Sequence, residues 1–244
     1  MPGIPDQAVD RVLVVVAHPD DAEFWAGGSI AIWARAGSEV TYCVLSDGDV
    51  GGFDTATPRT QIPQIRRAEQ VEAAALLGVG DVRFFGLGEG GFRQAGRALH
   101  VDLVRVIRQV RPRRVVTWSP EWNWQRFRSC HPDHLATGAA VLTAIYPDAG
   151  NQFALPQIKE QEGLDAWTVG EVWLLNSPQR EVNHHVDITE TFDRKVAAVR
   201  AHTSQIKDPD TLAHRLRERI APNTAAAGLP EGRLAEAFQV VVTG

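Results

Sequence analysis

The stretch "VVVAHPDDAEFWAGGSIAIWARAG" (residues 14–37) joins an apolar run to a histidine, a proline and two adjacent aspartates, and then to two glycines and a helical pattern. A buried strand that leads directly into a helix is the repeating unit of parallel α/β sheets. At such a junction the adjacent carboxylates of Asp20 and Asp21 would repel each other. Because a bound cation would remove this repulsion, the stretch predicts a fold class and also a metal site.

The rest of the chain continues this alternation of short β-branched runs and helical patterns. The patterns predict strands over 11–17, 40–46, 82–87, 113–119 and 170–176, and helices over 26–36, 64–77, 98–110, 134–145 and 189–203. This order indicates a Rossmann-like, three-layer α/β/α fold with a mostly parallel sheet. We expect a single domain over residues 1–244, in which 147–167 form a long loop.

Composition narrows the classes of protein to consider. The formal net charge is −5, which argues against a general nucleic-acid or membrane-surface protein. The two cysteines are too few for a disulfide framework, which favours a reducing compartment. The opening "MPGIPDQAVD" has no positively charged segment typical of a signal peptide, and no apolar run near it could span a bilayer. We therefore expect a cytoplasmic protein.

Polar side chains gather where the predicted strands end. In parallel sheets, ligands bind outside these carboxyl ends. The clusters are His18, Asp20 and Asp21 after the first strand, Ser46, Asp47 and Asp49 after the second, Glu89 after the third, and Ser119, Glu121 and the segment 129–134 after the fourth.

Two short motifs in these clusters have the spacing of metal ligands. His18 and Asp21 are three residues apart on a tight turn, and His131 and His134 stand at i, i+3 at a helix start. Either of the latter histidines could complete a set of two histidines and one aspartate. Three protein ligands with a fourth position for water are typical of catalytic zinc sites. Each motif alone could be a capped helix start, but their joint position at strand ends favours a metal site.

The same motifs resemble a known family. "AHPDDAEFWAGGS" (17–29) and "SCHPDH" (129–134) are similar to the two signature motifs of the PIG-L/LmbE-like, zinc-dependent N-deacetylases. The segments 65–78, 184–189 and 195–205 resemble further elements of that family, so the likeness extends from residue 11 to about 206. It implies an LmbE-like fold.

The resemblance also implies roles for individual residues. The zinc ligands would be His18, Asp21 and His134; the same donor set can hold Fe²⁺ or Co²⁺. Asp20 would be the general base. His131 would stabilise the oxyanion or protonate the leaving amine, and Asp133 would orient it. These roles match the chemistry of amide hydrolysis, which needs an activated water, an oxyanion partner and an acid.

Substrate contacts are expected from the loops around this centre. The candidates are Arg66, Glu89, Trp122 and Trp124. Arg66 could instead form a surface ion pair with Glu69, and the tryptophans of "WSPEWNWQRFR" (118–128) could serve packing alone.

Two further motifs suggest other chemistry and are weaker. "GLGEGG" (86–91) matches a dinucleotide fingerprint, but "FRQAG" (92–96) is expected to delay the helix that would receive a pyrophosphate. Cys130 beside His131 could form a thiol nucleophile, yet no third group that would orient the base is evident.

We therefore interpret the chain as a metal-dependent hydrolase of a small N-acyl substrate, with an N-acetyl amino sugar or glycoside favoured. The alternatives are an amidase of a thiol conjugate and a non-catalytic metal or sugar-binding module; a pure binding site would not need both Asp20 and His131. The expected partner is the small-molecule substrate, without nucleic acid or membrane. A homo-oligomer is compatible with the resemblance, since relatives often form trimers or hexamers.

Overall fold

The computed structural model describes residues 9–243, and of residues 93 and 94 only the backbone. Within this range seven strands form one sheet in the order β3-β2-β1-β4-β5-β7-β6, and β1 to β5 run parallel. Strand β7 pairs antiparallel with both β5 and β6. The strands are β1 (Arg11–Val16), β2 (Glu39–Ser46), β3 (Asp81–Leu87), β4 (Arg114–Trp118), β5 (Glu171–Leu175), β6 (His184–Asp187) and β7 (Ala235–Val242).

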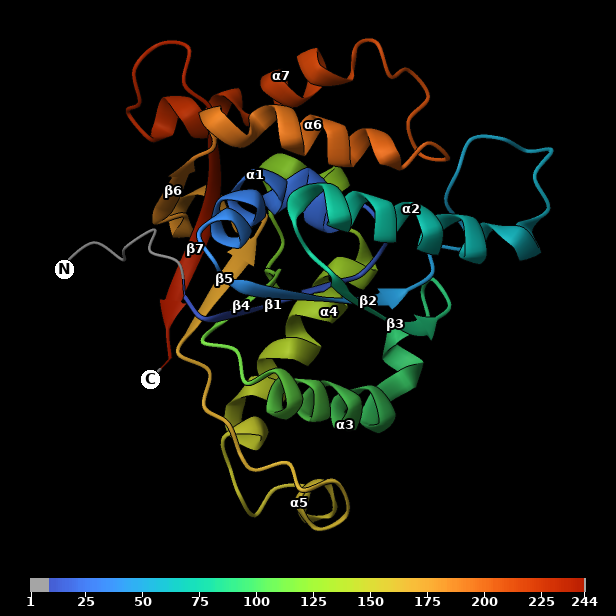
Figure 1. Ribbon diagram of the computed structural model, residues 1–244, viewed down its shortest axis with the longest axis vertical. Coiled ribbons are helices and arrows are strands. Elements are labelled where there is room, and N and C mark those ends of the chain that lie inside the picture. The colour runs from blue at the N-terminus through green and yellow to red at the C-terminus, as the bar shows by residue number, and fades with distance from the viewer. Residues whose placement is uncertain (1–8, 244) are drawn as a thin grey trace.

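Helices cover both faces of this sheet (Figure 1). On one face α1 and α2 pack beneath α6, and α7 lies beyond them; α3 and α4 cover the other face, with α5 below α3. The helices are α1 (Asp21–Arg35), α2 (Ile62–Leu77), α3 (Phe92–Val110), α4 (Pro132–Thr143), α5 (Pro156–Glu162), α6 (Phe192–Ala201) and α7 (Leu212–Ala226). The α/β fold with a mostly parallel sheet is confirmed. Short helical turns span 59–61, 124–129, 144–149, 179–181 and 189–191.

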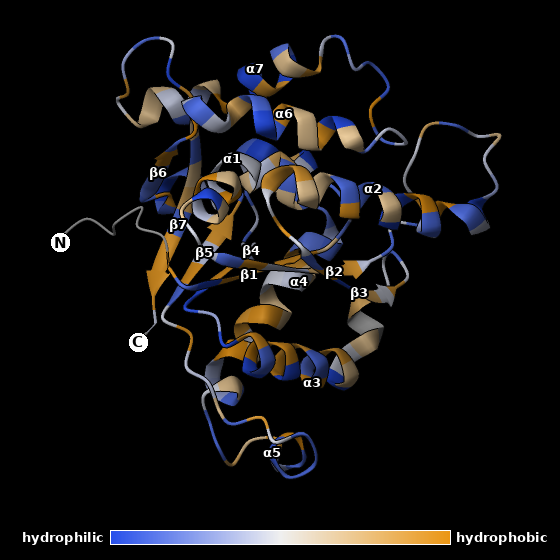
Figure 2. Ribbon diagram, viewed as in Figure 1, coloured by the Kyte–Doolittle hydropathy of each residue, from blue (hydrophilic) through white to orange (hydrophobic). Residues whose placement is uncertain are grey.

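The core lies along the central strands, which are apolar over most of their length (Figure 2). Val12 to Val16 of β1 have no exposed surface, because helices cover both faces of this strand. Burial on both faces explains why β1 reads as a continuous apolar run rather than an alternating one.

The strand order determines where in the fold the two sequence motifs lie. The chain passes from β1 outward to β2 and β3, and then returns to the other side of β1 as β4. The carboxyl ends of β1 and β4 therefore flank the switch point of the sheet, where α/β proteins bind their ligands. Both sequence motifs follow these two strands.

Several elements differ from expectation. Helix α3 begins at Phe92 rather than at residue 98, and Gly96 (φ 44°, ψ −119°) interrupts its helical geometry. Helix α1 begins at Asp21, five residues early, and the expected loop 147–167 contains α5. The strands β6 and β7 and the helix α7 were not predicted.

The opening segment, for which no signal peptide is expected, lies outside the described residues as far as residue 8. Within residues 9–243, no helix combines the length and apolarity that crossing a membrane requires.

Candidate metal centre

The turn between β1 and α1 has a strained backbone at Asp20. This residue has φ 97°, in the left-handed region that costs a side-chain-bearing residue free energy. Its N–H donates to Gln70 Oε1 at 2.9 Å. The next carboxylate, Asp21, accepts at Oδ2 from the backbone N–H groups of Ala17 (3.1 Å) and His18 (2.9 Å). The turn therefore fixes two adjacent carboxylates in different surroundings.

Three side chains from the two motifs converge on one point. Nδ1 of His18 lies 3.2 Å from Nε2 of His134 and 3.7 Å from Oδ2 of Asp21. Oδ1 of Asp21 lies 3.3 Å from the same Nε2. The three ligand atoms are all within 4.8 Å of one another and could hold a metal ion. The structure thus brings His18, Asp21 and His134 together.

Outer contacts orient these three groups. His134 Nδ1 lies 2.9 Å from the carbonyl oxygen of Ser129, and the ring stacks on Trp118 with centroids 3.6 Å apart. His18 Nε2 lies 3.4 Å from Oδ2 of Asp133. Nδ1 of His134 and Nε2 of His18 can donate their protons to these acceptors. The other nitrogen of each ring, which faces the convergence point, then keeps a free lone pair. Trp118 Nε1 also donates to Asp21 Oδ2 at 3.2 Å.

The charges of the centre suit a cation. Burial disfavours the charged form of His18, but hydrogen bonds to Asp133 and Asp21 outweigh it and raise the pKa of His18 to about 10. Burial would raise the pKa of Asp21, yet the charge and hydrogen bond of His134 hold it well below its usual range. A divalent metal supplies the same positive charge while leaving the imidazoles neutral, as ligation requires. The donor set therefore fits a metal with three protein ligands.

Asp20 is held beside this set by Arg66. Arg66 Nη2 donates to Oδ2 of Asp20 at 3.0 Å and to the carbonyl oxygen of Pro19. Its Nη1 donates to the carbonyl oxygen of Gly48 at 3.0 Å. A Cβ at Gly48 would lie 2.0 Å from Nη1, so this loop needs a glycine to pass the guanidinium. Burial raises the pKa of Asp20 to about 6, with Arg66 opposing and Asp21 adding to the rise.

Arg66 is 3% exposed and forms no surface pair with Glu69. Glu69 instead accepts from the hydroxyl of Thr203 and from the N–H and hydroxyl of Ser204. Arg66 and Glu69 of α2 therefore both hold neighbouring loops in place.

A second set of potential metal ligands also includes His18. His18, His131 and Asp133 also bring potential ligand atoms within 4.8 Å. Here, however, other bonds occupy the ligand atoms. His131 Nδ1 accepts from the N–H of Asp133 at 3.2 Å, and Asp133 Oδ2 accepts from the N–H of Gly90 at 2.7 Å. Nε2 of His131 lies 3.6 Å from Oε1 of Glu89. Burial, His18 and His134 lower the pKa of His131.

The carboxylate of Asp133 is closer to His18 than to His131. Its Oδ2 lies 3.4 Å from His18 Nε2 and 3.9 Å from His131 Nδ1. The expected contact between Asp133 and His131 is made by the Asp133 backbone N–H, and the Asp133 carboxylate contacts His18 instead.

The glycine-rich loop 86–91 leads into α3 without the expected delay. The N–H of Gly90 is nevertheless directed at Asp133, so the start of this helix contributes to the metal centre. The dinucleotide interpretation gains no support from this contact.

The tryptophans split into two groups. Trp118 is buried against His134, a contact that sequence reasoning missed although Trp118 is the last residue of β4. Trp122 and Trp124 are 41% and 68% exposed and stack on each other and on Phe127 at the surface. Their predicted contact with substrate stays a prediction.

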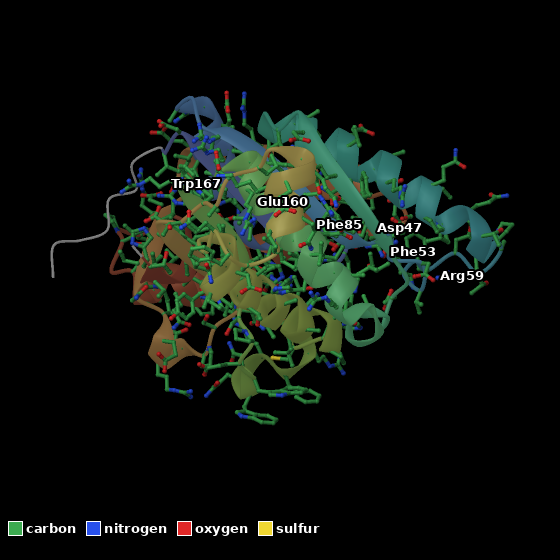
Figure 3. The ribbon with its side chains drawn as sticks, turned by 90° about the horizontal axis from the view of Figure 1, so that it is seen from below. Asp47, Phe53, Arg59, Phe85, Glu160 and Trp167 are labelled. Atoms are coloured by element: carbon green, nitrogen blue, oxygen red, sulfur yellow. The ribbon has the colours of Figure 1, made fainter. Side chains whose placement is uncertain are left out.

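The loop after β2 lies at one side of the molecule. Figure 3 labels Asp47, Phe53 and Arg59 of this loop together at one side of the molecule, with Trp167 at the opposite side. Asp47 pairs with Arg67 at 2.7 Å, and Phe53 is half exposed.

Two residues outside the ligand set show structural contacts. Cys130 is 5% exposed, and its sulfur accepts from the N–H of Asn123 at 3.2 Å, which supports a packing role over a nucleophilic one. His202 is fully buried, with Nε2 3.3 Å from Oε2 of Glu23. It lies behind α1 rather than in the ligand set.

Comparison with known proteins agrees with this geometry. The PIG-L family model, described as GlcNAc-PI de-N-acetylase, matches residues 13–145. The probable N-acetyl-α-D-glucosaminyl L-malate deacetylase 2 of Bacillus cereus is 31% identical over 203 residues, covering 80% of this chain and 83% of that protein.

Solved structures show the same fold. N,N′-diacetylchitobiose deacetylase from Pyrococcus horikoshii matches with a TM-score of 0.84 and 26% identity, covering 96% of this chain and 84% of that one. A 4-carboxy-2-hydroxymuconate hydratase from Pseudomonas putida matches with a TM-score of 0.77 over 97% of this chain and 98% of that one, but at 24% identity it shows a shared fold alone. The predicted family and its deacetylase class are confirmed: the chain belongs to the PIG-L family of de-N-acetylases.

Proposed function

We propose that the protein is a zinc-dependent N-deacetylase that removes the acetyl group from an N-acetyl amino sugar or its glycoside. One observation carries this proposal: three ligand atoms converge beside Asp20, a carboxylate that Arg66 holds next to the ligand set but outside it. The names of the similar deacetylases, which act on an N-acetylglucosaminyl malate and on diacetylchitobiose, support the substrate class.

The ligands would be His18, Asp21 and His134, and a bound zinc would acidify the attacking water and polarise the acetyl oxygen. Asp20 is the group that takes the proton from that water. Because the pKa of Asp20 is raised to about 6, this carboxylate is ionised near neutral pH and can also return the proton to the leaving nitrogen.

His131 is suited to stabilise the oxyanion. Its Nδ1 already accepts a hydrogen bond from the N–H of Asp133, so the ring proton lies on Nε2, which faces the open side near Glu89. A neutral imidazole in this state donates a hydrogen bond to the developing oxyanion. Of the two roles that the resemblance offers, this geometry favours oxyanion stabilisation.

The remaining polar residues position these groups. Arg66 fixes the Asp20 carboxylate against the strained turn, and the Asp133 carboxylate orients the His18 ring. Glu89 lies at the open side and would contact the substrate or the His131 ring. Outer contacts of this kind are worth about 10–100-fold in metal affinity or activity in comparable sites.

The fold alone would also suit other reactions, as the similar hydratase illustrates. A metal or sugar-binding module would not need a carboxylate held in the position of Asp20. An amidase of thiol conjugates would use the same groups and differs only in its substrate.

The test combines metal content with product release. The protein is purified without chelator, its metals are quantified by mass spectrometry, and free amine and acetate are measured with diacetylchitobiose and N-acetylglucosaminyl malate. About one zinc per chain, with chelator-sensitive amine release, is the expected result. Bound metal without release from any N-acetyl sugar would contradict the proposed substrate class, and release without a metal requirement would contradict the mechanism.

A further inference from the structure

The backbone turn at Asp20 needs support from outside α1. Asp20 is the N-cap of this helix, and its carbonyl oxygen accepts from the N–H of Phe24 at 3.0 Å. An aspartate in this position usually has an extended backbone, and its carboxylate caps the first N–H groups of the helix. Here φ is 97° and ψ is −25°, and the carboxylate makes no capping hydrogen bond. Such a backbone persists only where the surrounding structure holds it.

Helix α2 holds Asp20 at two points. Arg66 donates to the Asp20 carboxylate, and Gln70 accepts at Oε1 from the Asp20 backbone N–H at 2.9 Å. Arg66 and Gln70 are four positions apart, so they share one face of α2. Gln70 has no exposed surface. The carboxylate and the backbone of Asp20 are therefore held by separate side chains of one helix.

The amide of Gln70 can face Asp20 in only one orientation. Its Nε2 donates to Oε1 of Glu23 at 2.9 Å. An amide has one end that accepts and one that donates, whereas an ionised carboxylate only accepts and a backbone N–H only donates. Turning the Gln70 amide over would set its NH₂ group against the Asp20 N–H and its oxygen against the Glu23 carboxylate. Glu23 therefore fixes which end of the amide reaches Asp20.

Glu23 is itself held from the far side. Its side chain is fully buried in the first turn of α1, and its Oε2 lies 3.3 Å from Nε2 of His202. His202 directly follows α6 and is also fully buried. Its Nδ1 has no hydrogen-bond partner within residues 9–243, so Nε2 makes the polar contact of the ring. A series of contacts therefore runs from the end of α6 through Glu23 and Gln70 to the Asp20 N–H.

Packing alone does not account for these polar groups. Gln70, Glu23 and His202 have no exposed surface, and burying polar side chains costs free energy that apolar residues of similar size would not cost. None of the three belongs to the groups that could hold a metal ion. Their contacts lead instead to one backbone N–H, that of the residue with the strained turn.

We propose that Gln70 and Glu23 are positioning residues for Asp20, which keep the turn in the conformation that leaves its carboxylate free to act as the base. This inference rests on the proposed function, because it takes Asp20 as the base. Without the Gln70 oxygen the Asp20 N–H loses its acceptor, and the backbone can relax to the ordinary N-cap conformation. The carboxylate would then cap α1, and the rate would fall although the metal ligands stay in place.

The first test removes both hydrogen bonds of Gln70. Gln70→Met has a similar length but offers no N–H donor and only a weak acceptor. With zinc bound, kcat on whichever of diacetylchitobiose and N-acetylglucosaminyl malate the wild-type protein deacetylates should fall about 10–100-fold. The KM and the zinc bound per chain should stay within about twofold, because neither substrate nor metal contacts Gln70. Gln64→Met is the matched control, since Gln64 is an exposed residue of the same helix. An unchanged kcat in Gln70→Met would overturn the inference.

Interchanging the two polar groups separates positioning from packing. Gln70→Glu keeps an acceptor for the Asp20 N–H but sets two carboxylates against each other, so kcat should fall here too. In the double variant Gln70→Glu/Glu23→Gln, the carboxylate at position 70 accepts from the Asp20 N–H and from the new amide, whose oxygen accepts from His202. This variant should recover at least about tenfold in kcat over Gln70→Glu, because the two positions act as one network. No recovery would mean that the order of donor and acceptor does not support Asp20, which would overturn the inference.

Amide hydrogen exchange gives a readout that does not depend on turnover. In the wild-type protein Gln70 protects the Asp20 N–H, and the Asp21 carboxylate protects the N–H of His18. In Gln70→Met the Asp20 N–H should exchange at least about tenfold faster, while exchange at His18 changes by less than about twofold, because only the first hydrogen bond is lost. Equal acceleration at both positions would show a general loss of stability and would overturn the positioning role.

The hydrogen-exchange rates also separate the two possible failures. If the wild-type protein deacetylates no N-acetyl sugar, the proposed function fails, and the rates still show whether Gln70 holds the turn. If the wild-type protein is active and Gln70→Met retains both kcat and the protection of the Asp20 N–H, only the positioning role fails.

Discussion

The two strand–helix junctions at the candidate metal centre differ in length and burial. Between β1 and α1 lie only residues 17–20, whereas residues 119–131 separate β4 from α4. In the first junction His18 and Asp21 are 8% and 5% exposed. In the second, the His131 side chain is 39% exposed and Trp124 projects from the surface.

The difference suggests that the two junctions have different functions. In the short junction, hydrogen bonds hold both aspartates: the N–H of His18 binds the Asp21 carboxylate, and Gln70 and Arg66 bind Asp20. The long junction leads into α4, whose His134 stacks on Trp118 of β4, and it leaves His131 and Trp124 partly or largely exposed. We therefore expect the first junction to set the geometry of the metal and base, and the second to face the substrate.

The largest effect should separate His131, the last residue of the long junction, from His134 in the first turn of α4. His134→Ala removes a ligand atom, so metal affinity should fall by more than the roughly 10–100-fold that the loss of an outer contact costs. His131→Ala should keep the metal and lower kcat instead, because Nδ1 of His131 is already occupied by a hydrogen bond. Metal titration monitored by competition with a chromogenic chelator measures the metal affinity of both variants, and steady-state rates measure their kcat. Equal metal affinity in the two variants would overturn the ligand assignment.

The next effect concerns the short junction. Asp20→Asn should keep the metal, since Asp20 is outside the ligand group, and should lower kcat by about 10²–10⁴ because an amide cannot accept the proton. Metal content and steady-state rates on one preparation check this expectation. Asp54→Asn, in the exposed loop after β2, is the control. Loss of metal from Asp20→Asn would mean that the two aspartates exchange roles.

These two junctions are also where sequence reasoning succeeds. "HPDD" directly follows one apolar run, and "HPDH" comes at the helix start after the loop that follows the fourth predicted strand, which is enough to place His18, Asp21 and His134 at one edge of a parallel sheet. The motifs are local, and the parallel topology brings their strands together. Much of the sheet and both motif positions could thus be predicted.

The elements and contacts that sequence reasoning did not predict depend on distant parts of the chain or carry misleading local signals. Pro222 lies inside α7 and resembles a helix end, while β7 pairs with strands far away in the sequence. Trp118 lies in a strand, and only the stacking of α4 on β4 shows that it contacts His134.

A smaller effect should test the packing of α1, the helix that follows the short junction. A Cβ added at Gly28 of α1 would lie 2.6 Å from Cβ of Ile188, whereas a Cβ at Gly27 would lie 3.3 Å from Cγ of Lys195, a tight contact without overlap. Gly28→Ala should therefore lower the free energy of unfolding by about 1–3 kcal/mol through overpacking. Gly27→Ala is the matched control and should change it less. Urea unfolding measures both, and a larger loss for Gly27→Ala would show that the packing argument is wrong.

The smallest expected effect is a pH dependence of the free energy of unfolding that comes from His202, which is buried against Glu23 of α1. Burial disfavours a charge on His202, but the hydrogen bond and charge of Glu23, aided by Asp20 and Glu69, raise the pKa of His202 above its ordinary value. A raised pKa in the folded state stabilises the fold fully below the unfolded value of about 6.5, and this contribution is lost as the pH rises through the folded pKa.

The difference in unfolding free energy between the wild-type protein and His202→Gln should therefore be largest at or below pH 6.5 and shrink as the pH increases. Measuring this difference at each pH, with metal in excess, cancels the contribution of the other histidines. His214→Gln, at an exposed histidine on α7, is the control for the substitution itself. A difference that grows with pH would mean that the folded protein favours neutral His202. The buried carboxylate of Glu23 would then be held by its hydrogen bond from Gln70 and not by a charged imidazole.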